Sequence, residues 1–441
     1  MTSAPNRLLP LNGNNFLPVL FTFLALSTTT PLPLSQTKAS VPVKNFHAFF
    51  LPASSRKTRP AEADSLFKRK HAFTIAILLP FGSSKVFIND LDDPSGYYFP
   101  EQSQLSVEYY QGAIIALDSL RNQGLDVKLL VRDIGLDTSQ LRPVLEDPVF
   151  DSVDVMIGPI GNSGLRMTCE FSRNKGLWLI SPFSVATKGL LPNPYYILAN
   201  ATLESHCEKI YKYISQRSFG KKICLVYRKQ PGDLELVNYF KGFCRQLQDS
   251  NKIALQFLEI NDSSTIKYTQ IRDALSDSER NLIVIPSNDE SFVKLIMKQL
   301  DGLTNEYLMD VFGMPTWINF NHIPKDQMVN VSTHITQNFW LDKSAPQVVK
   351  FKDAYAMKFN MNPTDYAVKG YDQMMYFGGL LLQQGTDFTG AFHKAGVPEL
   401  AESFSIVPVM KDDSSNLILY NENKSVIMLQ YTADSLIKVQ E

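Results

Sequence analysis

The stretch IGPIGNSGLRMTCEFSRNKGLWLISPFS, residues 157–184, decides the fold class of this 441-residue chain. An apolar strand runs into Gly-Pro and a small polar loop, a helical pattern follows, and a second apolar strand ends in Ser-Pro-Phe-Ser. Strands joined through one helix pair in parallel with a right-handed crossover, so both polar loops leave the same edge of one sheet. In open parallel sheets, ligands bind at this edge.

The same alternation extends on both sides of that stretch. The run AFTIAILLPF, residues 72–81, is a continuous apolar segment of strand length, typical of a central parallel strand with both faces covered. Residues 109–120 place apolar side chains on one helical face, and Gly124 suits the end of that helix. A second series of helices and strands begins near residue 201. The pattern therefore predicts two tandem α/β units with parallel sheets, and thus a bilobal protein.

The late part of the chain predicts lobes that are discontinuous in sequence. Two helical patterns, residues 346–360 and 363–384, follow no new series of parallel strands. We expect these helices to return and cover an existing sheet. A β-rich tail with the segments FSIVPVM, LILYN and SVIMLQYT comes after them.

The composition bounds the class of partner. The chain is 44% hydrophobic and 20% charged, with a formal net charge of −1, so a large buried core is possible. This balance gives no support to a nucleic-acid-binding role, and it leaves a small-molecule site open.

The N-terminus has the pattern of an export signal. Arg7 precedes an apolar run from Phe16 to Leu26 that is too short to span a bilayer, and small residues follow. We expect a signal peptide over residues 1–27, a flexible linker over 28–70 and a location in the periplasm or cell envelope. No cysteine directly follows the apolar run, so the chain is not an obvious lipoprotein. The alternative is a chance apolar cluster in an irregular start.

Several segments together resemble the type 1 periplasmic binding proteins, in the branch of the branched-chain amino-acid receptors of ABC transporters. The segments are YYQGAIIALDSL, VMIGPIGNSG with LWLISPFS, NLIVIPSNDESFVKLIMKQL, and FKDAYAMKFNMNPTDYAVKGYDQMMYF. The resemblance implies two Rossmann-like lobes joined by a multi-strand hinge, which close on a ligand. It places lobe one at residues 72–199 plus 341–400, and lobe two at 203–335 plus 401–440.

The resemblance also implies the ligand-binding residues. In the amino-acid receptors the two loops of the opening stretch hold the carboxylate of the ligand, and this role falls here on Asn162, Ser163, Ser181 and Ser184. Ordinary helix capping is the alternative for such side chains. Other residues at strand ends complete the candidate set: Phe81, Phe183, Ser287, Asp289 and Trp317. For the aromatic members a place in the core is the alternative, and for Asp289 an N-cap.

One departure from the family pattern bears on the ligand. The receptors supply an acidic residue near the end of a second-lobe strand for the ligand's ammonium group, but this chain reads VFGMPTW at 311–317. An ammonium group without an opposite charge is costly in a dry site. An amino acid is therefore a doubtful ligand, and aromatic side chains with hydroxyls suit a peptide, a sugar or a cell-wall fragment.

Three functional hypotheses follow. The first is an exported solute-binding protein that presents its closed form to a membrane permease. The second is an envelope interaction protein of the same fold, similar to the activators of cell-wall synthases, in which ligand binding is repurposed or absent. The third is a ligand-sensing domain that works with a separate kinase, and nothing in the sequence separates it from the first.

Catalytic and metal-binding motifs are absent from the sequence. It contains no HExxH, G-x-S-x-G, P-loop or G-x-G-x-x-G pattern, and the six histidines show no close metal-ligand spacing. The four cysteines match no zinc or redox pattern, and their disulfide state stays open. We therefore expect no enzyme, no metal and no cofactor.

Overall fold

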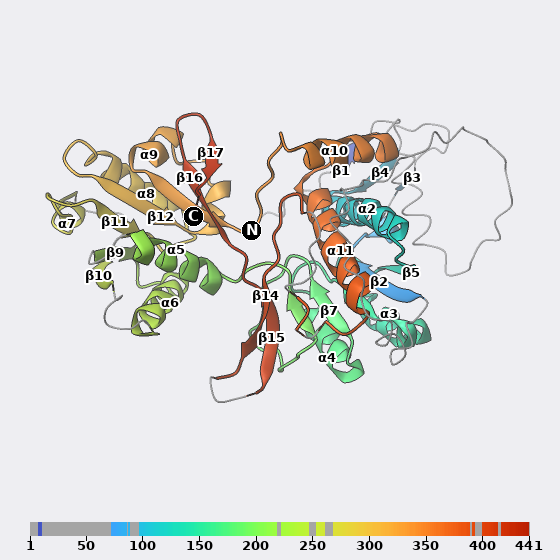
Figure 1. The fold of residues 1–441 in the computed structure, drawn as a ribbon. Coiled ribbons are helices and arrows are strands. Elements are labelled where there is room, and N and C mark those ends of the chain that lie inside the picture. Colours follow the sequence, from blue (N-terminus) through green and yellow to red (C-terminus); the bar gives the residue numbers. More distant parts are fainter. Residues whose placement is uncertain are drawn as a thin grey trace, which may run out of the picture. The chain divides into compact units, whose positions relative to one another are not determined.

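The computed structural model describes residues 8–10, 72–85, 87–88, 97–217, 222–246, 253–260, 268–388, 390–392, 399–412 and 416–440. The expected signal peptide and linker lie outside the described residues, apart from Leu8–Pro10. The chain divides into two compact units (Figure 1). The first unit is Met1–Asn200 with Leu341–Asn423, and the second is Ala201–Trp340 with Lys424–Glu441. Within the described residues, no helix has the length and apolar character needed to cross a membrane.

The first unit is built on a seven-stranded sheet of order β14-β15-β8-β7-β6-β2-β5. The strands are β2 (Phe73–Leu79), β5 (Val127–Asp133), β6 (Val155–Ile157), β7 (Trp178–Ser181), β8 (Tyr196–Leu198), β14 (Ile406–Met410) and β15 (Ile418–Asn423). All neighbouring pairs are parallel except β14 with β15. The predicted parallel α/β sheet, with β6 and β7 as direct neighbours, is confirmed.

Helices cover both faces of this sheet. Alternate residues of β2 divide between two cores, Ile75 and Ile77 in one and Ala76 and Leu78 in the other. The first core receives side chains from α2 (Glu101–Asn122) and α11 (Asp365–Gln384), with α10 (Pro346–Phe359) beside α2. The second receives side chains from α3 (Leu141–Glu146) and α4 (Leu165–Lys175). The late helix α11 thus returns to cover an existing sheet, as its sequence position predicts.

Two glycines allow α2 and α11 to lie side by side (Figure 1). A Cβ atom on Gly112 would lie 1.8 Å from the carbonyl oxygen of Ala367, and one on Gly370 would lie 2.0 Å from the carbonyl oxygen of Tyr109. The helices therefore meet backbone to backbone, and neither position has room for a side chain.

The tail of the chain corrects one predicted boundary. Residues 401–440 were expected in the second lobe, but β14 and β15 extend the sheet of the first unit, and only residues from Lys424 onward belong to the second. The reason is the parallel pairing of β15 with β8, in which Asn421 lies opposite Ile197. The Asn421 side chain donates to the carbonyl oxygen of Pro194 at 2.7 Å and so fixes this register.

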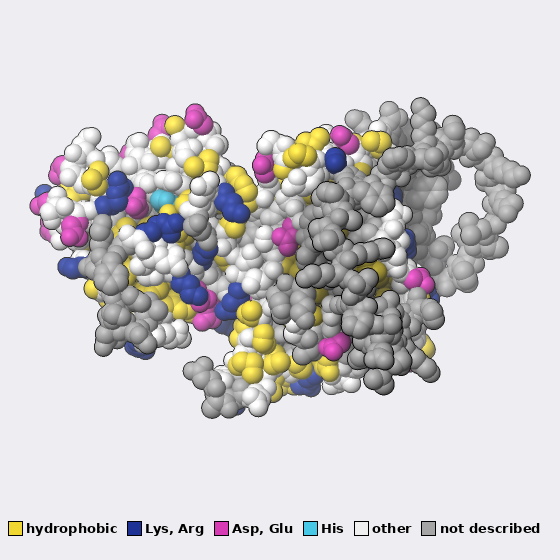
Figure 2. Space-filling model, viewed as in Figure 1, with side chains coloured by type: hydrophobic (Ala, Val, Ile, Leu, Met, Phe, Trp, Pro, Cys, Tyr) yellow, Lys and Arg dark blue, Asp and Glu magenta, His cyan; other side chains and the backbone are white. Residues whose placement is uncertain are grey.

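The edge strand β14 carries exposed apolar side chains. Figure 2 shows apolar side chains gathered over β14 and β15, and Val407, Met410 and Leu417 are each more than a third exposed. Pro408 lies in the middle of β14 and has no backbone N–H group to offer to a further strand. A proline in this place protects the sheet edge from unwanted pairing.

The second unit repeats the architecture around a sheet of order β10-β9-β11-β12-β13-β16-β17. Its strands are β9 (Lys222–Tyr227), β10 (Ala254–Glu259), β11 (Asn281–Val284), β12 (Met309–Gly313), β13 (Thr333–Gln337), β16 (Ile427–Tyr431) and β17 (Leu436–Lys438). The first five are parallel to one another, and β16 and β17 are antiparallel additions. The helices are α5 (Leu203–Arg217), α6 (Pro231–Gln246), α7 (Tyr268–Arg272), α8 (Glu290–Asp301) and α9 (Lys325–Asn330).

A third, small sheet has the order β1-β4-β3. It joins β1 (Leu8–Pro10), β4 (Tyr97–Pro100) and β3 (Phe87–Ile88) through antiparallel pairs. β4 leads directly into α2, so this sheet lies next to the N-terminus of that helix.

Candidate functional site

The loop that follows β2 is occupied by a carboxylate of the chain itself. Asp133, at the end of β5, accepts five hydrogen bonds of 2.6–3.1 Å, from the backbone N–H groups of Phe81, Gly82, Ser83 and Gly135 and from the hydroxyl of Ser83. The donors that this loop could offer to an anion are therefore already used.

Phe81, a candidate ligand-binding residue, is part of the core of the first unit. Its side chain is 0% exposed, and its ring meets that of Tyr110 edge to face at a centroid distance of 6.1 Å. In this structure the Phe81 side chain presents no surface to a ligand.

The loops after β6 and β7 are joined to each other. The hydroxyl of Ser184 donates to Oδ1 of Asn162 and accepts the backbone N–H of Ala186 at 3.1 Å. The hydroxyl of Ser181 is fully buried and donates to the carbonyl oxygen of Ser184 at 2.9 Å, which stabilises the second loop from within. Asn162 and Ser163 lie exposed at the surface of the first loop.

The first loop presents backbone donors that have no partner among the described residues. Gly161 and Gly164 adopt positive φ angles of 82° and 77°, so the chain turns sharply before α4 begins at Leu165. The backbone N–H groups of Gly161, Asn162 and Ser163 make no hydrogen bond to any residue that the structure describes. Donors at the N-terminus of a helix favour an anionic or otherwise hydrogen-bond-accepting group.

An aromatic side chain borders the second loop. Phe183 is half-buried and meets Tyr109 and Tyr366 edge to face, at centroid distances of 5.7 and 6.0 Å. Tyr366 is 40% exposed, and Nζ of Lys369 lies 5.6 Å from the centroid of the Phe183 ring. Tyr366 and Lys369 could not be predicted from the sequence, because both come from α11 and no local pattern links them to a loop almost two hundred residues earlier.

At the strand ends of the second unit, the candidates Ser287 and Asp289 surround a guanidinium group. Arg228 follows β9 and donates to Asp233 at 3.0 Å, to Asp289 at 2.9 Å and to the Ser287 hydroxyl at 3.2 Å. Burial lowers the pKa of Arg228, but its bonds to Asp233 and Asp289 outweigh that effect and leave the pKa raised. The bond from Arg228 and the backbone N–H of Phe292 lower the pKa of Asp289. Asp289 also caps α8, accepting that N–H at 3.1 Å.

Arg228 could not be predicted as part of this cluster from the sequence, since an arginine after a strand carries no distinctive spacing. Trp317, a candidate for lining the site, is 0% exposed in the core of the second unit, and its Nε1 donates to the carbonyl oxygen of Ser287 at 2.9 Å. Its ring fills the space beside Gly313, where a Cβ atom would lie 2.2 Å from it. Like Phe81, Trp317 presents no side-chain surface to a ligand in this structure.

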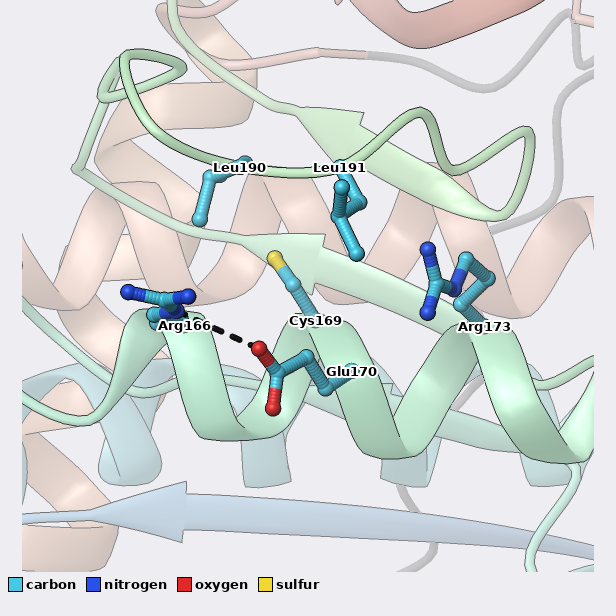
Figure 3. Close-up of a pocket in the computed structure, with 6 residues that line it drawn as sticks. All are labelled: Arg166, Cys169, Glu170, Arg173, Leu190 and Leu191. Atoms are coloured by element: carbon cyan, nitrogen blue, oxygen red, sulfur yellow. Dashed lines mark hydrogen bonds and ion pairs between the residues drawn. The ribbon is translucent and has the colours of Figure 1, made fainter.

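A shallow pocket with room for about one water molecule lies between α4 and the segment of Leu190 and Leu191 (Figure 3). It is lined by Arg166, Cys169, Glu170, Arg173, Leu190 and Leu191. Arg166 is paired with Glu170 at 3.2 Å, and burial raises the pKa of the Cys169 thiol to about 12, so the thiol stays protonated. Four of the lining residues lie on α4, and Leu190 and Leu191 lie in the connection between β7 and β8. We assign the pocket no ligand. Among the described residues, no group of three His, Cys, Asp or Glu side chains could hold a metal ion.

Comparisons with known proteins agree with this architecture. The model of the periplasmic binding protein family matches residues 102–401, more than half of the chain. A solved structure named for a branched-chain amino acid ABC transporter from Rhodospirillum rubrum is 14% identical and has a TM-score of 0.58, covering 83% of this chain and 100% of that one. A second solved structure is that of a branched-chain amino acid ABC transporter periplasmic ligand-binding protein from Burkholderia xenovorans LB400. It is 12% identical and has a TM-score of 0.53, and the match covers 83% of this chain and 94% of that one.

A comparison with curated proteins finds no match. At these identities the two solved structures show a shared fold, and the predicted two-lobed type 1 periplasmic binding protein fold is confirmed. Since the family model spans most of the described part of both units, the chain belongs to the periplasmic binding protein family.

Proposed function

We propose that this chain is an exported solute-binding protein that closes its two units on a small polar ligand and serves an ABC-type uptake system. Membership of the family supports a solute-binding role. The observation that carries the proposal is the pair of joined loops after β6 and β7, one of which presents backbone N–H groups without partners among the described residues. Closure would be a hinge motion that the ligand stabilises by contacting both units. The proposed location is the periplasm or cell envelope.

The loops favour a ligand with two kinds of surface. The N–H groups of Gly161, Asn162 and Ser163, which no described residue accepts, suit a carboxylate or another acceptor group. Phe183 and Tyr366 offer aromatic edges to an apolar or ring-shaped part. Peptides, sugars and cell-wall fragments combine such groups. Amino acids also belong in the test, because the two solved structures above are named for branched-chain amino acid transport.

The test is a melting-temperature panel on the purified protein. Amino acids, short peptides, sugars and cell-wall fragments are each added in large excess, and a ligand at about a hundred times its Kd raises stability by about 3 kcal/mol. That gain corresponds to a rise of about 5 °C or more. At least one class should produce it, and a flat response across all four would contradict the proposal.

Matched variants show whether the response comes from the proposed loops. Asn162→Ala removes an exposed side chain of the first loop, and Ser152→Ala removes an exposed hydroxyl elsewhere in the same unit. We expect the first variant to lose most of the melting-temperature response and the second to keep it.

The second candidate is an envelope interaction protein of the same fold, similar to a cell-wall synthase activator. The observation that favours it is the internal pairing of Arg228 with Asp233, Asp289 and Ser287, which leaves the strand ends of the second unit largely satisfied without a ligand. A pull-down from envelope extracts separates the two proposals. Recovery of a transporter permease supports the first, and recovery of a cell-wall synthase supports the second.

A further inference from the structure

We propose that the buried ion pair of Lys369 and Glu402 positions the ligand loop after β7 and ties it to Asn200, where the chain leaves the first unit. This inference deepens the proposed function, since it assigns positioning residues to the same loop. It depends on the proposed function only in taking this loop as one that contacts the ligand.

Two successive carbonyl groups of the loop are held by side-chain amides. The carbonyl oxygen of Pro182 accepts a hydrogen bond of 3.0 Å from Nε2 of Gln373. The carbonyl oxygen of Phe183 accepts one of 2.8 Å from Nδ2 of Asn200. Gln373 comes from α11, and Asn200 follows β8. The backbone of the loop is thereby fixed at two adjacent points, from two separate elements.

The ion pair determines which way both amides face. Nζ of Lys369 donates to Oδ1 of Asn200 at 2.9 Å, so only Nδ2 of that amide remains for the loop. Oε2 of Glu402 accepts from Nε2 of Gln373 at 3.0 Å, while Oε1 of Gln373 accepts the Tyr109 hydroxyl at 2.8 Å. Lys369 and Glu402 bond to each other, and their side chains are 12% and 1% exposed. If the Asn200 amide were reversed, its NH₂ group would face the Lys369 ammonium group. If the Gln373 amide were reversed, its oxygen would face the Glu402 carboxylate.

Glu402 is itself held in place. The carboxylate of Asp372 accepts the backbone N–H groups of Leu400, Ala401 and Glu402 at 2.7, 2.8 and 2.9 Å. Asp372 is fully buried, and it shares one face of α11 with Lys369 and Gln373 at helical spacing. One turn of α11 therefore anchors the segment that carries Glu402 and the pair that orients the loop.

The same network reaches two of the places where the chain passes between the units. Asn200 is the last residue of the first unit before Ala201, and Asn423 is the last before Lys424. Nδ2 of Asn423 donates to the carbonyl oxygens of Ala199 at 2.9 Å and Ser403 at 3.0 Å. A displacement of the chain at Asn200 consequently pulls on the carbonyl of Phe183, and a shift of the loop pulls on Asn200 in return.

Hydrogen–deuterium exchange of the full chain, without any ligand, tests this inference. The reporter is the peptide spanning 181–187, and the internal reference is β5, residues 127–133. Lys369→Met breaks the ion pair. Asn200→Asp is nearly isosteric: it keeps an oxygen facing Lys369 but removes the N–H group that holds Phe183. The second variant carries the test if the first fails to fold.

Two further variants serve as controls. Lys369→Arg retains the cation and should keep most of the protection of the loop. Lys358→Met breaks the exposed pair of Lys358 with Asp118, whose side chains are 40% and 49% exposed. It should leave the exchange rates of both the 181–187 and the β5 peptide unchanged.

We expect exchange in 181–187 to become at least ten times faster in Lys369→Met and Asn200→Asp, with β5 unchanged. Exchange within twofold of the wild type in both variants would overturn the proposal, and so would equal acceleration of both peptides, which reports a general loss of stability. Because no ligand is present, this outcome is independent of the melting-temperature panel. Either the positioning role or the proposed function can fail without the other.

Discussion

The hydroxyl of Ser184 donates a hydrogen bond to Oδ1 of Asn162, 22 positions earlier in the chain. This bond joins the loops that follow two neighbouring strands, β6 and β7. It joins the first loop, whose N–H groups at Gly161 and Ser163 have no partner among the described residues, to the second loop, which carries Phe183. The proposed ligand binding depends on these two joined loops.

The crossing of α2 over α11 gives a prediction about stability. Gly112→Ala places a Cβ atom 1.8 Å from the backbone of Ala367, and only a shift of one helix relieves that contact. We expect a loss of about 3 kcal/mol or more in the free energy of unfolding, measured with urea. Gly242→Ala, in α6, meets nothing within 4 Å and should be neutral or stabilise by about 0.5–1 kcal/mol. Equal effects of the two substitutions would contradict the close approach.

Asp133 provides a second prediction. Asp133→Asn replaces one carboxylate oxygen with an NH₂ group, which faces backbone donors of the loop after β2. Leaving those donors without an acceptor should lower the free energy of unfolding by about 3 kcal/mol. Asp151→Asn, at an exposed pair with Lys175, should cost about 0.5 kcal/mol or less. Chemical denaturation measures both, and an unchanged midpoint for Asp133→Asn would refute its role.

His206 predicts a pH dependence of stability. Its ring is 4% exposed, and burial lowers the pKa of His206 to about 4 from an ordinary value of 6.5. The unfolded chain therefore binds the proton of His206 more tightly than the folded chain does. The contribution of the neutral ring to the free energy of unfolding is fully present above pH 6.5 and is lost as the pH falls toward 4. Over that range the loss amounts to about 3 kcal/mol.

The variant His206→Phe should remove this loss. Its stability relative to the wild type should rise by up to about 3 kcal/mol between pH 7 and pH 4, as measured by urea unfolding at each pH. Tyr211→Phe is the control on the same helix, because burial raises the pKa of Tyr211 to about 12, far above this range. A constant difference between His206→Phe and the wild type would show that the ring does not titrate as proposed.

The sheets of both units could be predicted from sequence because their central strands are covered on two faces. Residues 73–79 are apolar almost throughout, so the segment reads as a strand without knowledge of its neighbours. The loops after β6 and β7 could be predicted for the same reason, since adjacent parallel strands place their ends at one edge.

Partners distant in sequence could not be predicted. The segment LILYN predicts a strand, but nothing in it tells which sheet that strand joins. Its pairing with β8, fixed by the bond from Asn421 to Pro194, places it in the first unit and not in the second. The occupation of the β2 loop by Asp133 depends on side-chain geometry that spacing does not report. No spacing in the sequence links Lys369 with Glu402, and only the fold shows them buried against each other.

The most direct test of the central claim is a calorimetric titration with the ligand that gives the largest melting-temperature response in the panel. The wild type is compared with Ser184→Ala and Asn162→Ala, which break the bond between the two loops, and with Ser152→Ala as the control. The account predicts one site per chain, with binding at least ten times weaker in both loop variants and unchanged in the control. Wild-type affinity in Ser184→Ala and Asn162→Ala would contradict it.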